Sequence, residues 1–256
     1  MNKQPVSYLQ TDARWKSKPY RVPGETSTIG SAGCGPACAA MVIATLKDKA
    51  VTPVETCAWS VAHGYKALKQ GTYYSYFAPQ LAAYGIECRQ LLGSRIINQP
   101  NHAIHDQVKE YLAQGYYVIA LMGPGTWTKS GHFVLLWAWD DKVRINDPAS
   151  TKEARLNGDP ATFRNEARCY WLVDARSYNT TDDNDEEDEN MPRYNTLEEI
   201  QKNASYALPT VKKLIAKKAI QGGGKKDADG NPADMDLSRD MLRMLTFNDR
   251  AGAYDD

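Results

Sequence analysis

Apolar residues recur at helical spacing through much of the first half of the chain. Residues 34–46 are apolar or small at nearly every position, which predicts a helix buried on almost all sides. Gly33, Gly35 and Pro36 mark its start, because proline is tolerated in the first turn of a helix. Three further helices are predicted over residues 53–64, 76–84 and 104–114, and the last two precede a glycine.

After residue 115 the pattern changes to short runs rich in β-branched and aromatic residues. These runs predict strands over residues 116–122, 133–139, 142–147 and 170–173. Helices followed by an antiparallel sheet are typical of an α+β domain.

A run of acidic residues separates this part from the C-terminal part. Residues 181–190 contain seven Asp and Glu and no Lys or Arg, which predicts a solvated linker. We therefore predict a first domain over residues 1–178, a linker over 179–192 and a small helical domain over 193–256. The last should contain helices over 208–220 and 236–252, with Asp236 or Ser238 as the N-cap of the second.

The composition is ordinary for a globular protein, with 42% hydrophobic and 24% charged residues and a net charge of zero. The charge is unevenly spread, because residues 1–180 carry 20 Lys and Arg against 14 Asp and Glu, or +6. A mildly basic first domain suits an anionic target such as a bacterial cell wall, although ordinary surface charge explains it equally well.

Five cysteines, at positions 34, 38, 57, 88 and 169, include no CxxC pair. Neither a disulfide framework nor a zinc ribbon is indicated, and synthesis in a reducing compartment fits best. The first residues contain no apolar stretch suited to a signal peptide, and no run approaches the roughly 18 apolar residues of a membrane span. We expect synthesis in the host cytoplasm, no membrane insertion and, for any action on the cell wall, release without such a signal.

Cys34 is the candidate nucleophile. It lies at the N-terminal end of the predicted buried helix, where unpaired N–H groups and the helix dipole stabilise a thiolate. We expect the flanking glycines to let a substrate backbone approach closely. A buried cysteine that only packs in the core is the alternative, and that is the role expected of Cys38, one turn further along.

His132 immediately precedes the apolar strand over 133–139. If Asp140 and Asp141 form a two-residue turn, Trp139 pairs with Lys142 and residue 134 faces Asp147. His132 then lies diagonally across from Asp147 on the same face of the hairpin, within reach of a side-chain contact. A one-residue change in the turn would bring Asn146 to that face instead.

The remaining histidines and Gln10 carry weaker signals. His63 is near a helix end, and His102 and His105 have the spacing of a metal-binding face but no accompanying acidic or thiol ligand. We therefore predict no metal and no cofactor. A glutamine amide can donate to an oxyanion, but chemistry alone does not distinguish Gln10 from a surface residue.

Four segments in order carry a family resemblance: residues 8–15 (YLQTDARW), 33–41 (GCGPACAAM), 131–134 (GHFV) and 146–148 (NDP). Over about residues 5–175 the chain resembles papain-like cysteine peptidases related to the bacteriocin-processing, double-glycine-leader peptidases. The motif after the nucleophile usually reads Gly-Pro-Thr-Ser in that family, whereas Ala37 and Cys38 stand in the last two positions here. The resemblance implies a papain-like fold and four catalytic residues, namely Cys34 as nucleophile, His132 as base, Asp147 as its orienting acid and Gln10 at the oxyanion.

The C-terminal part also resembles a known module. Residues 205–254 are similar to the C-terminal module of endolysins from phages of clostridia-like bacteria. This resemblance implies cell-wall targeting, although a small helical module could equally serve to form a homodimer.

These features predict a phage-type endopeptidase that cuts peptide bonds of peptidoglycan, with no nucleic-acid partner. A leader-processing protease, or an amidase with the same triad, is the first alternative. A wall-binding protein without activity is the second.

Overall fold

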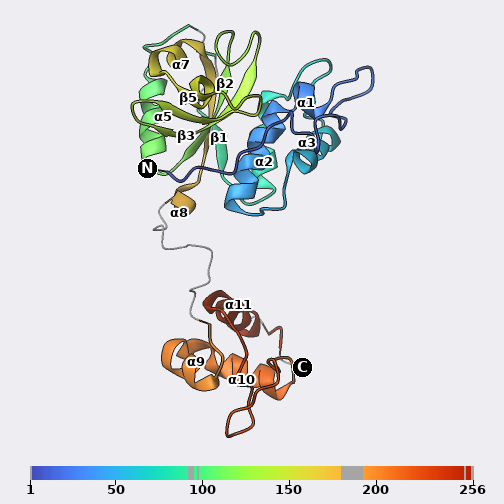
Figure 1. Cartoon of the computed structure of the whole chain (residues 1–256), viewed down its shortest axis with the longest axis vertical. Helices are drawn as coiled ribbons and strands as arrows, with labels where there is room; N and C mark the ends of the chain where they lie inside the picture. Colours follow the sequence, from blue (N-terminus) through green and yellow to red (C-terminus); the bar gives the residue numbers. More distant parts are fainter. Residues whose placement is uncertain (1, 92–94, 97, 180–192, 251, 255–256) are drawn as a thin grey trace. The chain divides into compact units, whose positions relative to one another are not determined.

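The computed structural model describes residues 2–91, 95–96, 98–179, 193–250 and 252–254, and it contains two compact units, residues 1–182 and 183–256 (Figure 1). The acidic segment predicted over 179–192 lies, apart from Asn179, outside the described residues. The predicted domain boundaries therefore stay a prediction, and each unit is described by itself.

The first unit is built around one antiparallel sheet in the order β1-β6-β2-β3-β4-β5. Its strands are β1 (Cys88–Gln90), β2 (Tyr117–Met122), β3 (His132–Trp139), β4 (Val143–Asn146), β5 (Asn157–Gly158) and β6 (Ala167–Val173). Its helices are α1 (Ile29–Ala32), α2 (Cys34–Leu46), α3 (Pro53–Ala62), α4 (Phe77–Ala82), α5 (Ile104–Ala113), α6 (Glu153–Leu156), α7 (Pro160–Glu166) and α8 (Arg176–Asn179), with the 3-10 turn η1 (Tyr74–Tyr76) before α4.

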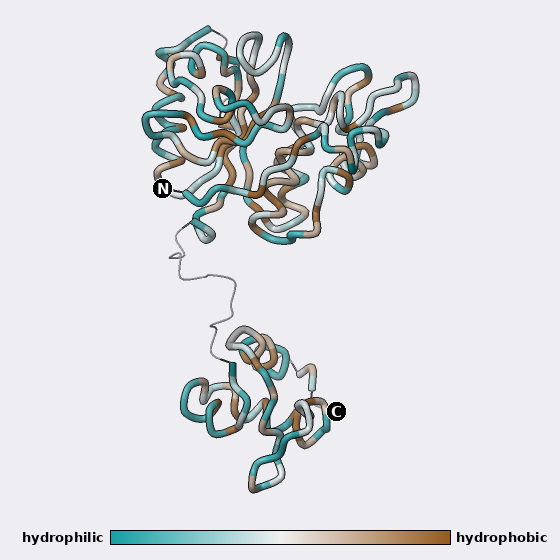
Figure 2. Tube along the Cα trace, viewed as in Figure 1, coloured by the Kyte–Doolittle hydropathy of each residue, from teal (hydrophilic) through white to brown (hydrophobic). Residues whose placement is uncertain are grey.

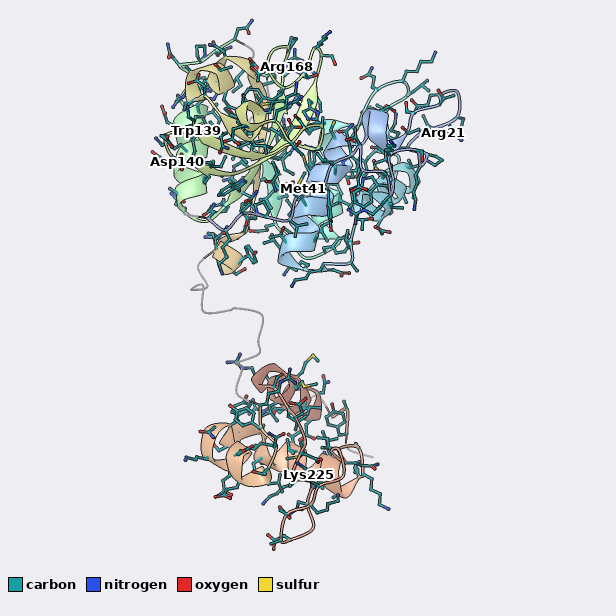
Figure 3. The ribbon with its side chains drawn as sticks, viewed as in Figure 1. Arg21, Met41, Trp139, Asp140, Arg168 and Lys225 are labelled. Atoms are coloured by element: carbon teal, nitrogen blue, oxygen red, sulfur yellow. The ribbon has the colours of Figure 1, made fainter. Side chains whose placement is uncertain are left out.

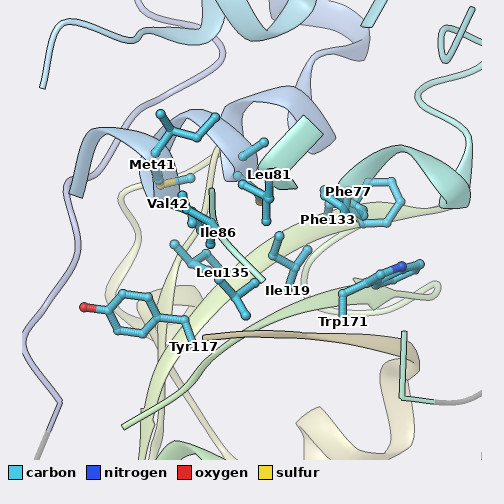
Figure 4. Packing of buried hydrophobic residues seen from close by; sticks show 14 of the residues in the cluster. Met41, Val42, Phe77, Leu81, Ile86, Tyr117, Ile119, Phe133, Leu135 and Trp171 are labelled. Atoms are coloured by element: carbon cyan, nitrogen blue, oxygen red, sulfur yellow. The ribbon is translucent and has the colours of Figure 1, made fainter. Parts of the chain in front are cut away.

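Helices cover both faces of this sheet, α2 one face and α5 with α7 the other (Figure 1). Successive strand residues alternate between the two cores: Ile119 and Leu135 pack with α2, whereas Val118 and Val134 pack with α5. Figure 2 shows the hydrophobic segments gathered along the sheet and α2. Figure 4 shows the α2 side of the sheet, with labels on Met41, Val42, Phe77, Leu81, Ile86, Tyr117, Ile119, Phe133, Leu135 and Trp171.

The predicted α+β class with an antiparallel sheet is confirmed. The helix predicted over 34–46 has those bounds, and the other three predicted helices of this unit start within one residue of the prediction and end one or two residues early. Sequence analysis missed the short elements α1, α6, α7, α8, β1 and β5. Elements of two to seven residues are too short to show a hydrophobic period.

The β3–β4 hairpin corrects the predicted turn. Trp139 pairs with Val143 rather than Lys142, so the turn has three residues, and the Lys142 N–H donates to Asp140 Oδ1 over 2.8 Å. Figure 3 labels Trp139 and Asp140 at this end of the hairpin. The ladder then shifts register between Leu136 and Ala138, which absorbs the extra residue. Beyond this bulge Leu136 pairs with Ile145 and Leu135 with Asn146, as the predicted register requires.

The second unit is helical, with α9 (Leu197–Asn203), the 3-10 turn η2 (Ser205–Ala207), α10 (Leu208–Ala216) and α11 (Arg239–Arg250). The helix predicted over 208–220 ends earlier because Lys218 takes a left-handed conformation, with φ 59°. Of the two predicted N-caps for the last helix, Ser238 accepts from the Met241 N–H over 3.2 Å. The unit has its own core of Tyr194, Ile200, Ala204, Ala207, Val211, Met235, Leu237 and Leu242.

Among the residues that the structure describes, no helix combines the length and the apolar character that crossing a membrane requires.

Candidate active site

Cys34 is the first residue of α2, and its side chain is half-buried. The glycines on either side of Cys34 leave no room for a side chain, because other residues of the protein pack against them. A Cβ atom at Gly33 would lie 2.6 Å from the carbonyl oxygen of Ile29, and one at Gly35 would lie 3.0 Å from Thr72 Oγ1. The expectation that both glycines make room for a substrate backbone is therefore corrected, because neighbouring chain segments fill that space.

His132 is the first residue of β3, and Asp147 directly follows β4. Both side chains are buried, and His132 Nε2 lies 2.7 Å from Asp147 Oδ1. The Ala149 N–H donates to the same carboxylate oxygen over 2.8 Å. The structure thus brings together the two residues that the parity of the hairpin selected, while Asn146 instead donates from Nδ2 to the carbonyl of Pro5.

Cys34 and His132 act on one another, since the imidazole lowers the pKa of the thiol and the thiol raises the pKa of the imidazole. Since Nε2 contacts Asp147, Nδ1 is the ring nitrogen available to the thiol. Burial alone would lower the pKa of His132, but its hydrogen bonds with Asp147 and Cys34 outweigh burial and raise that pKa to about 9. Burial opposes the Cys34 thiolate as well, yet hydrogen bonding and charge from His132, with smaller contributions from the N–H groups of Phe133 and Gly35, lower the pKa of the thiol. These opposite shifts favour a thiolate–imidazolium pair.

Gln10 lies between the segment that carries Cys34 and the segment that carries Asp147. Its backbone N–H donates to the Pro148 carbonyl over 2.7 Å, and its side-chain Nε2 donates to the Gly30 carbonyl over 2.9 Å. The side chain is 7% exposed. An amide nitrogen carries two hydrogens, so the second can donate to a substrate oxygen.

Arg155 also belongs to this site, and sequence analysis did not identify it. Its Nε lies 2.6 Å from Asp147 Oδ2, as an ion pair whose direction is poor for a hydrogen bond. Arg155 follows Asp147 by eight residues in the short helix α6, and no motif or periodicity in residues 153–156 marks it.

The other cysteine and histidine candidates have structural roles. Burial raises the pKa of Cys38 well above its usual range, so this thiol packs in the core. His105 is fully buried between Tyr170 Oη at 2.8 Å and the Gln99 carbonyl at 3.0 Å. His63 stacks on Trp59. Within the described part of the chain, no group of three or more His, Cys, Asp or Glu converges as a metal site would require.

Replacing His132 by alanine should slow the alkylation of Cys34. Burial would then act on the thiol without the opposing imidazolium, so the pKa of Cys34 should rise and its thiolate fraction should fall. We expect iodoacetamide to modify Cys34 at least ~10-fold more slowly in His132→Ala, measured by mass spectrometry of the Cys34 peptide. His63→Ala is the matched control and should react at the wild-type rate. An unchanged rate in His132→Ala would show that the imidazole does not activate the thiol.

Comparison with known proteins gives a family. Residues 8–178 match the Peptidase_C39 like family. A solved structure described as a double glycine motif protease from AMS/PCAT transporter in complex with the leader peptide is 17% identical, covers 67% of this chain and 93% of its own, and has a TM-score of 0.41. No curated protein matches. The family match covers more than half of the chain, which therefore belongs to the Peptidase_C39 like family and is a cysteine peptidase with the papain-like fold.

Proposed function

We propose that this chain hydrolyses peptide bonds in bacterial peptidoglycan, with Cys34 as nucleophile, His132 as acid and base, Asp147 as the residue that orients His132, and Gln10 as an oxyanion donor. The observation that carries the chemistry is the Cys34 thiol at the start of α2, linked to an imidazole whose far nitrogen lies 2.7 Å from a buried carboxylate. A nucleophile, a base and a residue that orients the base are the parts that acyl transfer requires.

In the first half of the reaction the Cys34 thiolate attacks the peptide carbonyl carbon. A C–S bond forms and the carbonyl electrons move to oxygen, which accepts hydrogen bonds from Gln10 Nε2 and the Cys34 N–H. The C–N bond then breaks while the His132 imidazolium gives its proton to the leaving amine. The products of this half are a free amine and a thioester on Cys34.

In the second half a water molecule releases the acyl group. Neutral His132 takes a proton from water as the water oxygen attacks the thioester. The C–S bond breaks, the thiolate leaves as the anion, and the resting thiolate–imidazolium pair is restored. Asp147 keeps the His132 ring in one tautomer and orientation through both halves.

The cell-wall substrate is inferred from features outside the triad. The chain carries a second unit with its own core, and residues 205–254 resemble the C-terminal modules of phage endolysins. Three large hydrophobic side chains are exposed on η2 and α11 of this unit: Tyr206 at 42%, Met241 at 47% and Met244 at 65%. We infer that this unit holds the enzyme on the wall. An exposed apolar surface of this kind would also suit a homodimer.

Leader-peptide processing is the second candidate, because the family match is to Peptidase_C39. Such a protease would cut after a Gly-Gly pair in a soluble peptide and leave cell walls intact. An amidase with the same triad would instead release stem peptides from the sugar chain.

We expect wild-type protein to clear a suspension of purified Gram-positive cell walls and to create new amino termini within the stem or bridge peptides. Cys34→Ala should lower the rate by about 10³-fold or more, since it removes the nucleophile. Cys88→Ala is the matched control, because this half-buried cysteine lies on β1 outside the triad. Turbidity and mass spectrometry of the products give the readouts. Cleavage of a Gly-Gly peptide without clearing of walls would favour leader processing, and clearing by Cys34→Ala would contradict the mechanism.

Wall targeting is tested with the inactive Cys34→Ala chain, which binds without cutting. We expect it to sediment with cell walls, and deletion of residues 193–256 should lower the bound fraction by about 10-fold or more, as loss of one of two linked binding modules does. Equal binding by the two proteins, together with a dimer of the full chain in sedimentation, would assign this unit to dimerisation instead.

A further inference from the structure

Asp147 is shared between two cationic side chains rather than committed to His132 alone. We propose that Arg155 is a positioning residue of the active site, which holds Asp147 in place and offsets part of its charge. The proposal rests on the catalytic roles proposed above for Cys34, His132 and Asp147. It assigns a function to a residue that no sequence motif marks.

The two oxygens of the Asp147 carboxylate have different partners. Oδ1 receives the His132 Nε2–H at 2.7 Å and the Ala149 N–H at 2.8 Å, whereas Oδ2 lies 2.6 Å from Arg155 Nε. The Asp147 side chain is 0% exposed and that of Arg155 is 19% exposed. A carboxylate removed from water needs compensating charge, and the His132 imidazolium is already paired with the Cys34 thiolate. The guanidinium of an arginine supplies a positive charge.

Arg155 is itself held by the chain segment that leads into His132. Its Nη2 donates to the Trp127 carbonyl over 2.7 Å, and Trp127 Nε1 donates back to the Arg155 carbonyl over 3.0 Å. Trp127 is 3% exposed, and its ring would lie 2.9 Å from a Cβ atom at Gly158, so little space surrounds it. One guanidinium therefore connects Asp147 to the loop between β2 and β3.

Other titratable groups near the triad do not supply this charge. Cys34 on α2 interacts electrostatically with His132, and Cys38 on the same helix interacts electrostatically with Asp147. Cys57 on α3 and Tyr20 interact electrostatically with Cys34, and burial raises the pKa of Cys38, Cys57 and Tyr20. These three side chains stay neutral near pH 7. The Cys34 thiolate and Asp147 therefore act on the His132 imidazolium directly, and Arg155 acts on it through its ion pair with Asp147.

Removal of the Arg155 charge should make the His132 imidazolium harder to deprotonate. Asp147 stays anchored by Ala149 and His132, but its negative charge is then offset by the imidazolium alone. The imidazolium becomes more stable, so it should lose its proton at a higher pH than in the wild type. A lysine at this position keeps the charge, but its single ammonium cannot reproduce the planar guanidinium that pairs with Asp147 while it donates to the Trp127 carbonyl.

The test is the pH dependence of Cys34 alkylation by iodoacetate in the full chain. This anion reacts fastest while His132 is protonated, so the falling alkaline side of the profile reports the loss of the imidazolium proton. We expect Arg155→Gln to move that side up by roughly half a pH unit or more, and to lower kcat on cell walls about 10- to 100-fold. Arg155→Lys should keep the alkaline side near that of the wild type. Arg164→Gln, which breaks a 2.6 Å ion pair with Asp106 between α7 and α5, is the matched control and should change neither quantity.

Failure of the Arg155 role and failure of the proposed cell-wall substrate give different results. An alkaline side that is unchanged or lower in folded Arg155→Gln, or that moves as far in Arg164→Gln, would overturn the positioning role. If thermal melts show that Arg155→Gln does not fold, Arg155→Met removes the same charge with an apolar side chain and carries the same expectation. Failure of the wild type to cut cell walls would refute the proposed substrate while leaving the alkylation profile, and hence this inference, fully readable.

Discussion

The contact between the His132 ring and the buried carboxylate of Asp147 is the interaction on which the rest of the site depends. Burial by itself would lower the pKa of His132, and the 2.7 Å contact with Asp147 is a principal cause of the opposite shift. The protonated ring in turn makes the half-buried Cys34 thiolate favourable at the start of α2. A buried carboxylate therefore acts on the nucleophile through the imidazole between them.

Each member of the site comes from a different part of the fold. Cys34 begins the helix that covers one face of the sheet, His132 begins a central strand, and Asp147 directly follows the neighbouring strand. The packing of α2 against β3, with Phe133 beside Gly35, sets the distance between thiol and imidazole. Gln10, which precedes Asp147 in the chain, donates to the Pro148 carbonyl, and Arg155, which follows Asp147, forms an ion pair with it. Small shifts between these layers would separate the reacting groups, and dense packing prevents them.

Sequence reasoning succeeded where local patterns carry the information. The unbroken apolar run predicted α2 over residues 34–46, and side-chain alternation predicted the meeting of His132 and Asp147. The latter prediction assumed a two-residue turn, and it holds because the bulge at Trp137 compensates the third turn residue. Arg155 was not predictable because no motif or periodicity in residues 153–156 marks it. The close approach of Thr72 to Gly35 was not predictable because it joins segments distant in sequence. The catalytic roles and the wall-targeting role stay predictions.

The protonation state of the His132 ring decides whether this site can hold Cys34 as a thiolate. In the full chain with ¹⁵N-labelled histidine, NMR spectra recorded between roughly pH 5 and pH 10 report the charge of each ring. We predict that His132 stays an imidazolium through neutral pH and titrates near pH 9, and that Asp147→Asn lowers this value. A His132 ring that is already neutral at pH 7 in the wild type would contradict the account, because no imidazolium would then be present to stabilise the Cys34 thiolate.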